Sequence, residues 1–153
     1  MDVNQKAPDF TLPDENGEPV ALSSFKGKPV LLFFYPRANT PGCTVEACGF
    51  RDNYAKLIRA GYIVLGISPD TAKAQKKFQE KYQLPYTLLA DAEKEVAKLY
   101  DVLKEKNMYG KKVMGIERTT FLIAPDGAIA QIWRKVKPEG HAEQILAEAG
   151  THK

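Results

Sequence analysis

The chain has 153 residues, 44% hydrophobic and 27% charged, a composition typical of one globular domain rather than a disordered or fibrous chain. Its formal net charge of +3, from 22 basic and 19 acidic side chains, is too small and dispersed to indicate nucleic acid or an anionic membrane as partner. The longest apolar run, residues 30–35, is far too short to span a membrane, and the first residues do not resemble a signal peptide. We therefore expect one cytoplasmic domain over residues 1–153.

The first half of the chain has the pattern of a hairpin followed by a βαβ unit. Short strands near 9–12 and 20–22 flank an Asn-Gly turn, which favours a β-hairpin. The runs 29–35 and 62–67 are continuously apolar, as in parallel strands that are covered on both faces. Helical spacing of apolar residues over 43–60 predicts one helix between these two strands.

The second half continues the alternation of strands and helices. The remaining elements are expected as a helix over 71–82, a strand near 86–89, a helix over 92–100, a hairpin of 118–123 with 128–133, and a helix over 139–149. This order predicts an α/β fold with a mixed central sheet and helices on both faces. Because ligands in such sheets favour the carboxyl ends of the strands, the loop after 29–35 is the expected site.

Cysteine and histidine are scarce, with only two of each: Cys43, Cys48, His141 and His152. Both histidines lie far from the cysteines in the sequence, unlike the local ligand spacing of structural zinc, so we expect no metal site. The two cysteines are five positions apart, which is not the Cys-x-x-Cys spacing of a disulfide oxidoreductase.

Cys43 occupies a favourable place for a reactive thiol. Thr40-Pro41 is a helix start signal, with Thr40 as the N-cap and Pro41 as the first helical residue. Cys43 is then the third helical residue, where free N–H groups and the helix dipole favour a nucleophilic thiolate. Cys48 lies more than a turn further along and lacks this advantage. Simple core packing, common for free cysteines, remains open mainly for Cys48.

Residues 36–43, Pro-Arg-Ala-Asn-Thr-Pro-Gly-Cys, match the Pro-x-x-x-Thr-x-x-Cys motif of the peroxiredoxins. Residues 44–52 then resemble the peroxiredoxin Q branch, also called bacterioferritin comigratory protein, and the similarity extends over essentially the whole chain. This resemblance implies a thioredoxin-like fold and an antioxidant enzyme that reduces hydrogen peroxide and organic hydroperoxides. The family uses cysteine chemistry without a metal or flavin cofactor.

The resemblance also implies a role for each motif residue. Cys43 matches the peroxidatic cysteine, whose thiolate attacks the O–O bond and becomes a sulfenic acid. Thr40 matches the residue whose hydroxyl contacts thiolate and peroxide, and Pro36 the residue that shields the site from water. Arg118 matches the arginine that stabilises the thiolate and the leaving oxygen. Glu46 takes the place of a glutamate that orients this arginine.

Each of these roles has a plainer alternative. Thr40 could act only as the N-cap, and Glu46 could simply interact favourably with the helix dipole. Arg118 could be a surface residue of its strand, with Arg37 and Arg51 as rival guanidinium groups. Tyr35 and Phe50 are expected in the core or the pocket wall.

Cys48 is the expected resolving cysteine of an atypical two-cysteine enzyme, forming an intramolecular disulfide with Cys43. In an intact helix, Cα atoms five residues apart are separated by about 8.6 Å, whereas a disulfide needs less than about 7 Å. The helix must therefore unwind locally, helped by Gly42 and Gly49. A monomer suffices for this chemistry, and the family resemblance implies thioredoxin as reductant, with glutaredoxin or a small thiol as alternatives.

Two other classes of function compete with the peroxidase. A thioredoxin-like exchange or chaperone protein would direct both cysteines to protein substrates, but the chain lacks Cys-x-x-Cys. A non-catalytic binding domain would need only packed cysteines, which the Thr-Pro-Gly-Cys helix start makes a poor fit.

Overall fold

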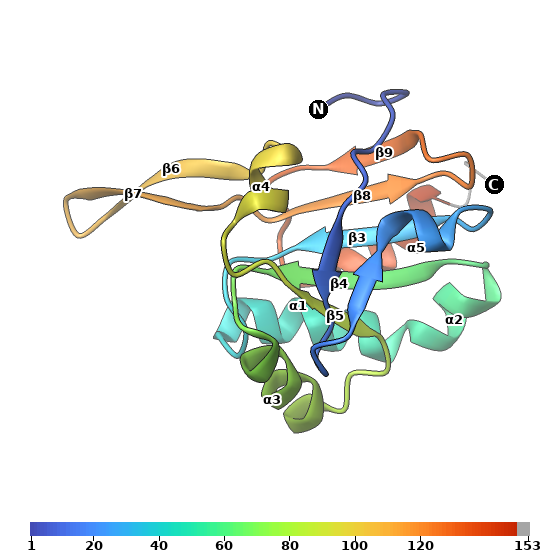
Figure 1. Cartoon of the computed structure of the whole chain (residues 1–153). Helices are drawn as coiled ribbons and strands as arrows, with labels where there is room; N and C mark the ends of the chain where they lie inside the picture. The colour runs from blue at the N-terminus through green and yellow to red at the C-terminus, as the bar shows by residue number, and fades with distance from the viewer. Residues whose placement is uncertain (150–153) are drawn as a thin grey trace.

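The computed structural model of the chain describes residues 1–149 and contains a five-stranded mixed sheet (Figure 1). The strands are β3 (Val30–Phe34), β4 (Ile63–Ser68), β5 (Thr87–Ala90), β8 (Thr119–Ile123) and β9 (Ile129–Trp133). Their spatial order is β5-β4-β3-β8-β9, with β3, β4 and β5 parallel and β8 and β9 antiparallel to their neighbours. The α/β fold with a mixed sheet is therefore confirmed.

Helices and short elements cover both faces of this sheet (Figure 1). One face carries α1 (Pro41–Asp52), α2 (Tyr54–Arg59), α3 (Ala72–Tyr82) and α5 (His141–Ala149). The other carries the hairpin β1 (Thr11–Pro13) and β2 (Pro19–Ala21), the 3-10 turn η1 (Leu22–Phe25) and α4 (Glu95–Leu99). All five β3 side chains are buried because they alternate between these two cores, which explains the continuous apolar run in the sequence.

Two helix predictions were too long. The helix expected over 43–60 is divided at Asn53, whose buried side chain donates to the Gly49 carbonyl at 2.9 Å and so competes with the helical backbone. The helix expected over 92–100 shrinks to α4, because Lys94 takes the left-handed conformation at φ 60°. The Asp91 carboxylate accepts from the N–H group of Ala97 at 2.9 Å and stabilises this late start.

The hairpin of β6 (Leu103–Met108) and β7 (Lys111–Ile116) was missed. It forms a separate two-stranded sheet that projects away from the body of the molecule (Figure 1). Its ends at Leu103 and Ile116 pack against the core, whereas positions 111–114 are exposed. The segment therefore lacks the alternating pattern that a strand with one buried face shows. Among residues 1–149, no helix is long and apolar enough to cross a membrane.

Candidate active site

The loop between β3 and α1 is attached to the end of the neighbouring strand. The Ala38 N–H donates to Asp70 Oδ2 at 2.8 Å, and the Ser68 hydroxyl donates to the same oxygen at 2.6 Å. Ser68 is the last residue of β4, so Asp70 holds the loop at the carboxyl edge of the parallel strands. Sequence reasoning missed Asp70, although its place directly after a predicted parallel strand was an available signal.

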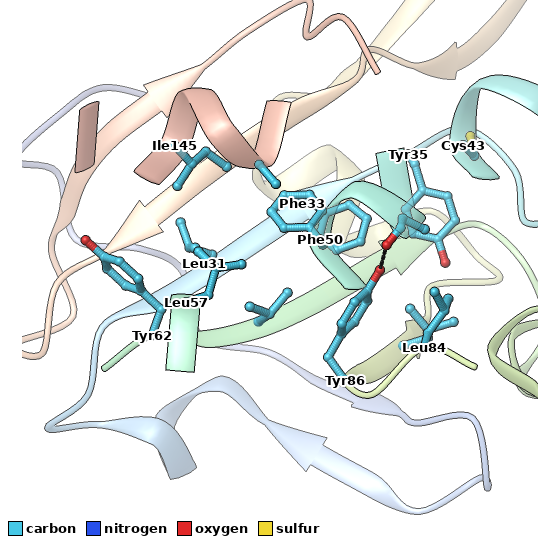
Figure 2. Close-up of a cluster of buried hydrophobic side chains, with 14 of the residues drawn as sticks. Leu31, Phe33, Tyr35, Cys43, Phe50, Leu57, Tyr62, Leu84, Tyr86 and Ile145 are labelled. Atoms are coloured by element: carbon cyan, nitrogen blue, oxygen red, sulfur yellow. Dashed lines mark hydrogen bonds between the residues drawn. The ribbon is translucent and has the colours of Figure 1, made fainter. Parts of the chain in front are cut away.

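Cys43 is the third residue of α1 and is 1% exposed, so its predicted place at the helix start is confirmed. The Arg118 guanidinium donates from Nη2 to the Cys43 sulfur at 3.3 Å. A Cβ at Gly42 would lie 3.2 Å from the same Nη2, so the missing side chain gives the guanidinium room beside the helix. Figure 2 shows Cys43 at one end of the buried cluster that contains Phe33 and Phe50.

Glu46 lies one turn further along α1 and binds the other nitrogen of the same guanidinium. The distance from Arg118 Nη1 to Glu46 Oε1 is 2.7 Å, and the Glu46 side chain is fully buried. Its second oxygen, Oε2, has no hydrogen-bond partner among residues 1–149. Burial raises the pKa of Glu46 to about 7, against the opposing effect of the Arg118 charge. One forked guanidinium therefore connects Cys43 and Glu46, which are 75 and 72 residues away from it in the sequence.

The rival arginines do not take this place. Arg51 binds Asp52 at 3.0 Å and donates to the Tyr82 carbonyl at 2.8 Å, and Arg37 is exposed. Within residues 1–149, Arg118 is the guanidinium group that contacts Cys43. The alternative of Arg118 as a free surface residue is wrong.

Thr40 precedes α1 as predicted, but its side chain does not cap the helix. The hydroxyl instead donates to the Arg37 carbonyl at 3.0 Å, which turns it away from the helix N–H groups. Within the described part of the chain, the N–H groups of Gly42 and Cys43 consequently have no acceptor. The prediction that the Thr40 side chain caps the helix is therefore wrong. The first turn of α1 keeps backbone N–H donors available for a ligand oxygen beside Cys43. Pro36 is half-buried in the same loop.

Cys48 lies on the same continuous helix as Cys43, is half-buried, and both thiols are free. No side-chain hydrogen bond holds the Cys48 thiol among residues 1–149. The adjacent Ala47 carbonyl accepts a hydrogen bond from the Tyr86 hydroxyl at 2.6 Å, drawn as a dashed line in Figure 2. The structure thus holds α1 intact between the two cysteines.

His141, the histidine within residues 1–149, is part of the core and has its hydrogen-bond partners there rather than at the cysteines. His141 is 2% exposed, with Nε2 2.8 Å from Thr120 Oγ1 and Nδ1 3.2 Å from Gln144 Oε1. Burial lowers the pKa of His141, which favours a neutral ring. His152 lies outside the described residues. Tyr35 and Phe50 are fully buried, as expected of core residues.

Residues 3–132 match the AhpC/TSA family. The chain belongs to this family. It is 53% identical over 146 residues to a putative peroxiredoxin bcp of Coxiella burnetii, covering 95% of this chain and 97% of that protein. It is 46% identical to the peroxiredoxin Bcp of Bacillus subtilis, with 95% and 93% of the two chains covered.

Solved peroxiredoxin structures have the same fold as this family member. A cysteine-to-serine mutant of Xanthomonas campestris peroxiredoxin Q superposes with a TM-score of 0.93 at 38% identity, covering 100% of both chains. A structure of the bacterioferritin comigratory protein of the same species, described for alkyl peroxide reduction, gives a TM-score of 0.92 at 38% identity over 99% of both chains. These relatives confirm the thioredoxin-like peroxiredoxin fold and support a thiol peroxidase with an antioxidant role.

Proposed function

We propose that this peroxiredoxin reduces hydrogen peroxide and organic hydroperoxides at Cys43. The observation that carries the proposal is the hydrogen bond from Arg118 to the Cys43 sulfur, at a helix start with free N–H groups. The thiolate attacks one peroxide oxygen, an S–O bond forms, and the O–O bond breaks. The leaving oxygen takes a proton and departs as water or an alcohol, while Cys43 becomes a sulfenic acid.

The surrounding residues act on this step in different ways. Arg118 stabilises the thiolate and the charge that develops on the leaving oxygen, because its fork can donate to both. Thr40 supplies its hydroxyl oxygen as an acceptor for the peroxide O–H, and Pro36 shields the site from water. Glu46 fixes the orientation of the guanidinium through the 2.7 Å ion pair. We assign Glu46 to positioning, because its carboxylate binds Arg118 and not the Cys43 sulfur.

Cys48 acts as the resolving cysteine in the second step. Its thiolate attacks the Cys43 sulfenic acid, the S–O bond breaks, and water leaves as the intramolecular disulfide forms. The intact helix keeps the two Cα atoms about 8.6 Å apart, so the first turns of α1 unwind in each cycle. Unwinding must break the hydrogen bond between Tyr86 and the Ala47 carbonyl.

The cycle closes when a reductant returns the disulfide to two thiols. We assign this role to thioredoxin, with glutaredoxin or a small thiol as the alternatives to exclude. Both cysteines lie on one chain, so a monomer is sufficient for this cycle and is the functional unit that we propose. We propose that this monomer is one domain over residues 1–153 and that it acts in the cytoplasm.

Thiol trapping with mass spectrometry tests this sequence of events. One equivalent of hydrogen peroxide added to the reduced protein should rapidly convert both thiols to a Cys43–Cys48 disulfide. The Cys48→Ser variant should stop at a trapped sulfenic acid on Cys43, and the Cys43→Ser variant should not react rapidly. Hydrogen exchange should show weaker protection of residues 43–50 in the oxidised protein than in the reduced protein.

Two results would contradict different parts of the proposal. Rapid peroxide consumption by Cys43→Ser would remove Cys43 from the first step. A stable sulfenic acid without a disulfide in the unmutated protein would remove Cys48 from the second step and make the enzyme a one-cysteine peroxidase.

A further inference from the structure

The β6–β7 hairpin carries the charge excess of the entire chain. Residues 103–116 contain four lysines and one glutamate, a net charge of +3, which equals the formal net charge of all 153 residues. Outside the hairpin, 18 basic residues are balanced by 18 acidic ones, from totals of 22 and 19. The net positive charge therefore resides on a hairpin that projects from the body (Figure 1).

The tip of the hairpin bears an aromatic residue that local folding does not favour. Tyr109 and Gly110 form the two-residue turn, with φ angles of 54° and 77°. Such turns favour Asn-Gly, because a bulky side chain is strained at positive φ. Tyr109 is nevertheless present and is 100% exposed. Strain combined with full exposure of an aromatic side chain points to binding rather than to stability.

Further apolar surface accompanies Tyr109 on the same hairpin. Met114 is 51% exposed and Val113 is 39% exposed, in a strand that also presents the exposed Lys111 and Lys112. Glu105 pairs with Lys112 at 3.6 Å, whereas no salt bridge of Lys111 occurs among the described residues. Exposed apolar groups among cationic ones suit a protein surface that is acidic with an apolar centre.

The hairpin is directly connected to the active site. Its second strand ends at Ile116, two residues before Arg118, whose guanidinium contacts Cys43. Six extended residues span about 20 Å. A partner that reaches the cysteines while touching the hairpin tip must therefore be as large as a small protein, and a small thiol cannot do both.

We propose that the β6–β7 hairpin is the docking arm for an acidic protein dithiol that re-reduces the oxidised enzyme. This inference rests on the proposed peroxidase cycle and deepens its last step. A thiolate of the bound partner attacks the Cys43–Cys48 disulfide, forming a mixed disulfide and releasing one enzyme thiol. The second partner thiol then breaks the mixed disulfide, so two electrons pass to the enzyme and the partner leaves as a disulfide.

Re-reduction kinetics of the full chain test this assignment, with thioredoxin as the protein dithiol and dithiothreitol as the small one. Tyr109→Asn keeps a favourable turn, and Lys111→Glu reverses an exposed charge. Each should lower kcat/KM for thioredoxin by at least about fivefold, with little change for dithiothreitol or for oxidation by hydrogen peroxide. Added salt should slow reduction of the unmutated protein by thioredoxin more than reduction of Lys111→Glu. Lys28→Glu, before β3 at the opposite end of that strand, is the matched charge control and should behave as the unmutated protein.

Other results would overturn either the docking arm or the proposed function. Equal thioredoxin rates for the unmutated protein and both hairpin variants would overturn the docking arm while leaving the peroxidase intact. Reduction of the unmutated protein by dithiothreitol but not by thioredoxin would overturn the protein partner. A Tyr109-dependent dimer in sedimentation, or Tyr109-dependent binding to phosphatidylserine vesicles, with unchanged thioredoxin rates would likewise overturn it. Absence of the disulfide after peroxide treatment would instead contradict the proposed function.

Discussion

The two cysteines lie on one helix in contrasting surroundings. Cys43 is 1% exposed, begins α1 and receives a hydrogen bond from Arg118 at 3.3 Å. Cys48, more than one turn later, is half-buried and lacks such a contact within residues 1–149. In the cycle that we propose, Cys43 is therefore arranged in advance for attack on a peroxide, whereas disulfide formation with Cys48 requires the helix to rearrange.

Replacing Arg118 should remove the advantage of Cys43 and gives the largest expected effect. Arg118→Ala should lower the second-order rate of Cys43 oxidation by about 10²–10³, the usual effect of losing one preorganised donor. The oxidation rate of Arg118→Lys should lie between those of Arg118→Ala and the unmutated protein. Lysine keeps the positive charge but lacks the forked guanidinium that binds both Cys43 and Glu46. Stopped-flow measurements with hydrogen peroxide give these rates.

Folding must be controlled in this experiment, because Arg118→Ala leaves the buried Glu46 without its partner. The double variant Arg118→Met, Glu46→Leu removes both charges and should fold while staying slow. A double variant as fast as the unmutated protein would contradict the role of the guanidinium.

Glu46 lies between the two cysteines and should make stability depend on pH. Its folded pKa of about 7 is raised above the ordinary value of 4.5 by burial, so the folded state retains a proton that the unfolded state releases. The unfolding free energy should therefore fall as pH rises from about 4.5 to about 7, by about 3 kcal/mol from this group.

Urea unfolding of Glu46→Gln across this pH range measures the contribution. The variant should lack the fall, whereas Glu93→Gln, an exposed control, should keep it. Identical pH profiles for Glu46→Gln and the unmutated protein would place the Glu46 pKa near its ordinary value.

Tyr86 should slow the second step by holding α1 together near Cys48. Tyr86→Phe removes the hydrogen bond to the Ala47 carbonyl, and about 1 kcal/mol of lost restraint should speed disulfide formation roughly fivefold. Tyr100→Phe is the matched control, because its hydroxyl donates to the Pro8 carbonyl at 2.6 Å in the core on the other face. Quenched-flow trapping of the sulfenic acid measures both. Equal rates for the two variants would show that opening near Ala47 does not limit the step.

Local sequence signals were sufficient to predict an element of the fold where one physical cause determined it. Pro41 marked the start of α1, and the continuous apolar runs of β3 and β4 marked two parallel central strands. The turn at 125–127 marked the β8–β9 hairpin. In each case the deciding interaction is either local in the chain or follows directly from burial on both faces.

Other features depend on contacts that no local pattern reveals. The division of the helix at Asn53 involves Glu143, 90 residues away, which accepts from the Asn53 side chain at 2.9 Å. The clamp between Asp70 and Ala38 joins two loops that only the sheet brings together. The hydroxyl of Thr40 binds the Arg37 carbonyl instead of capping the N–H groups of α1. Both partners are near in the sequence, so sequence alone does not decide between them.

The C-terminal part of α1 is held by an aromatic stack that rests on a glycine, Gly66. Phe50 stacks on Phe33 with ring centroids 4.4 Å apart. Phe33 itself lies over Gly66, where a Cβ would approach its ring to 2.8 Å. Because this stack holds the helix just beyond Cys48, the opening that we propose ends before Phe50 leaves the core. The opening therefore exposes less apolar surface than it would if Phe50 also left the core. Its heat-capacity change is correspondingly smaller, so a plot of its free-energy cost against temperature is less curved.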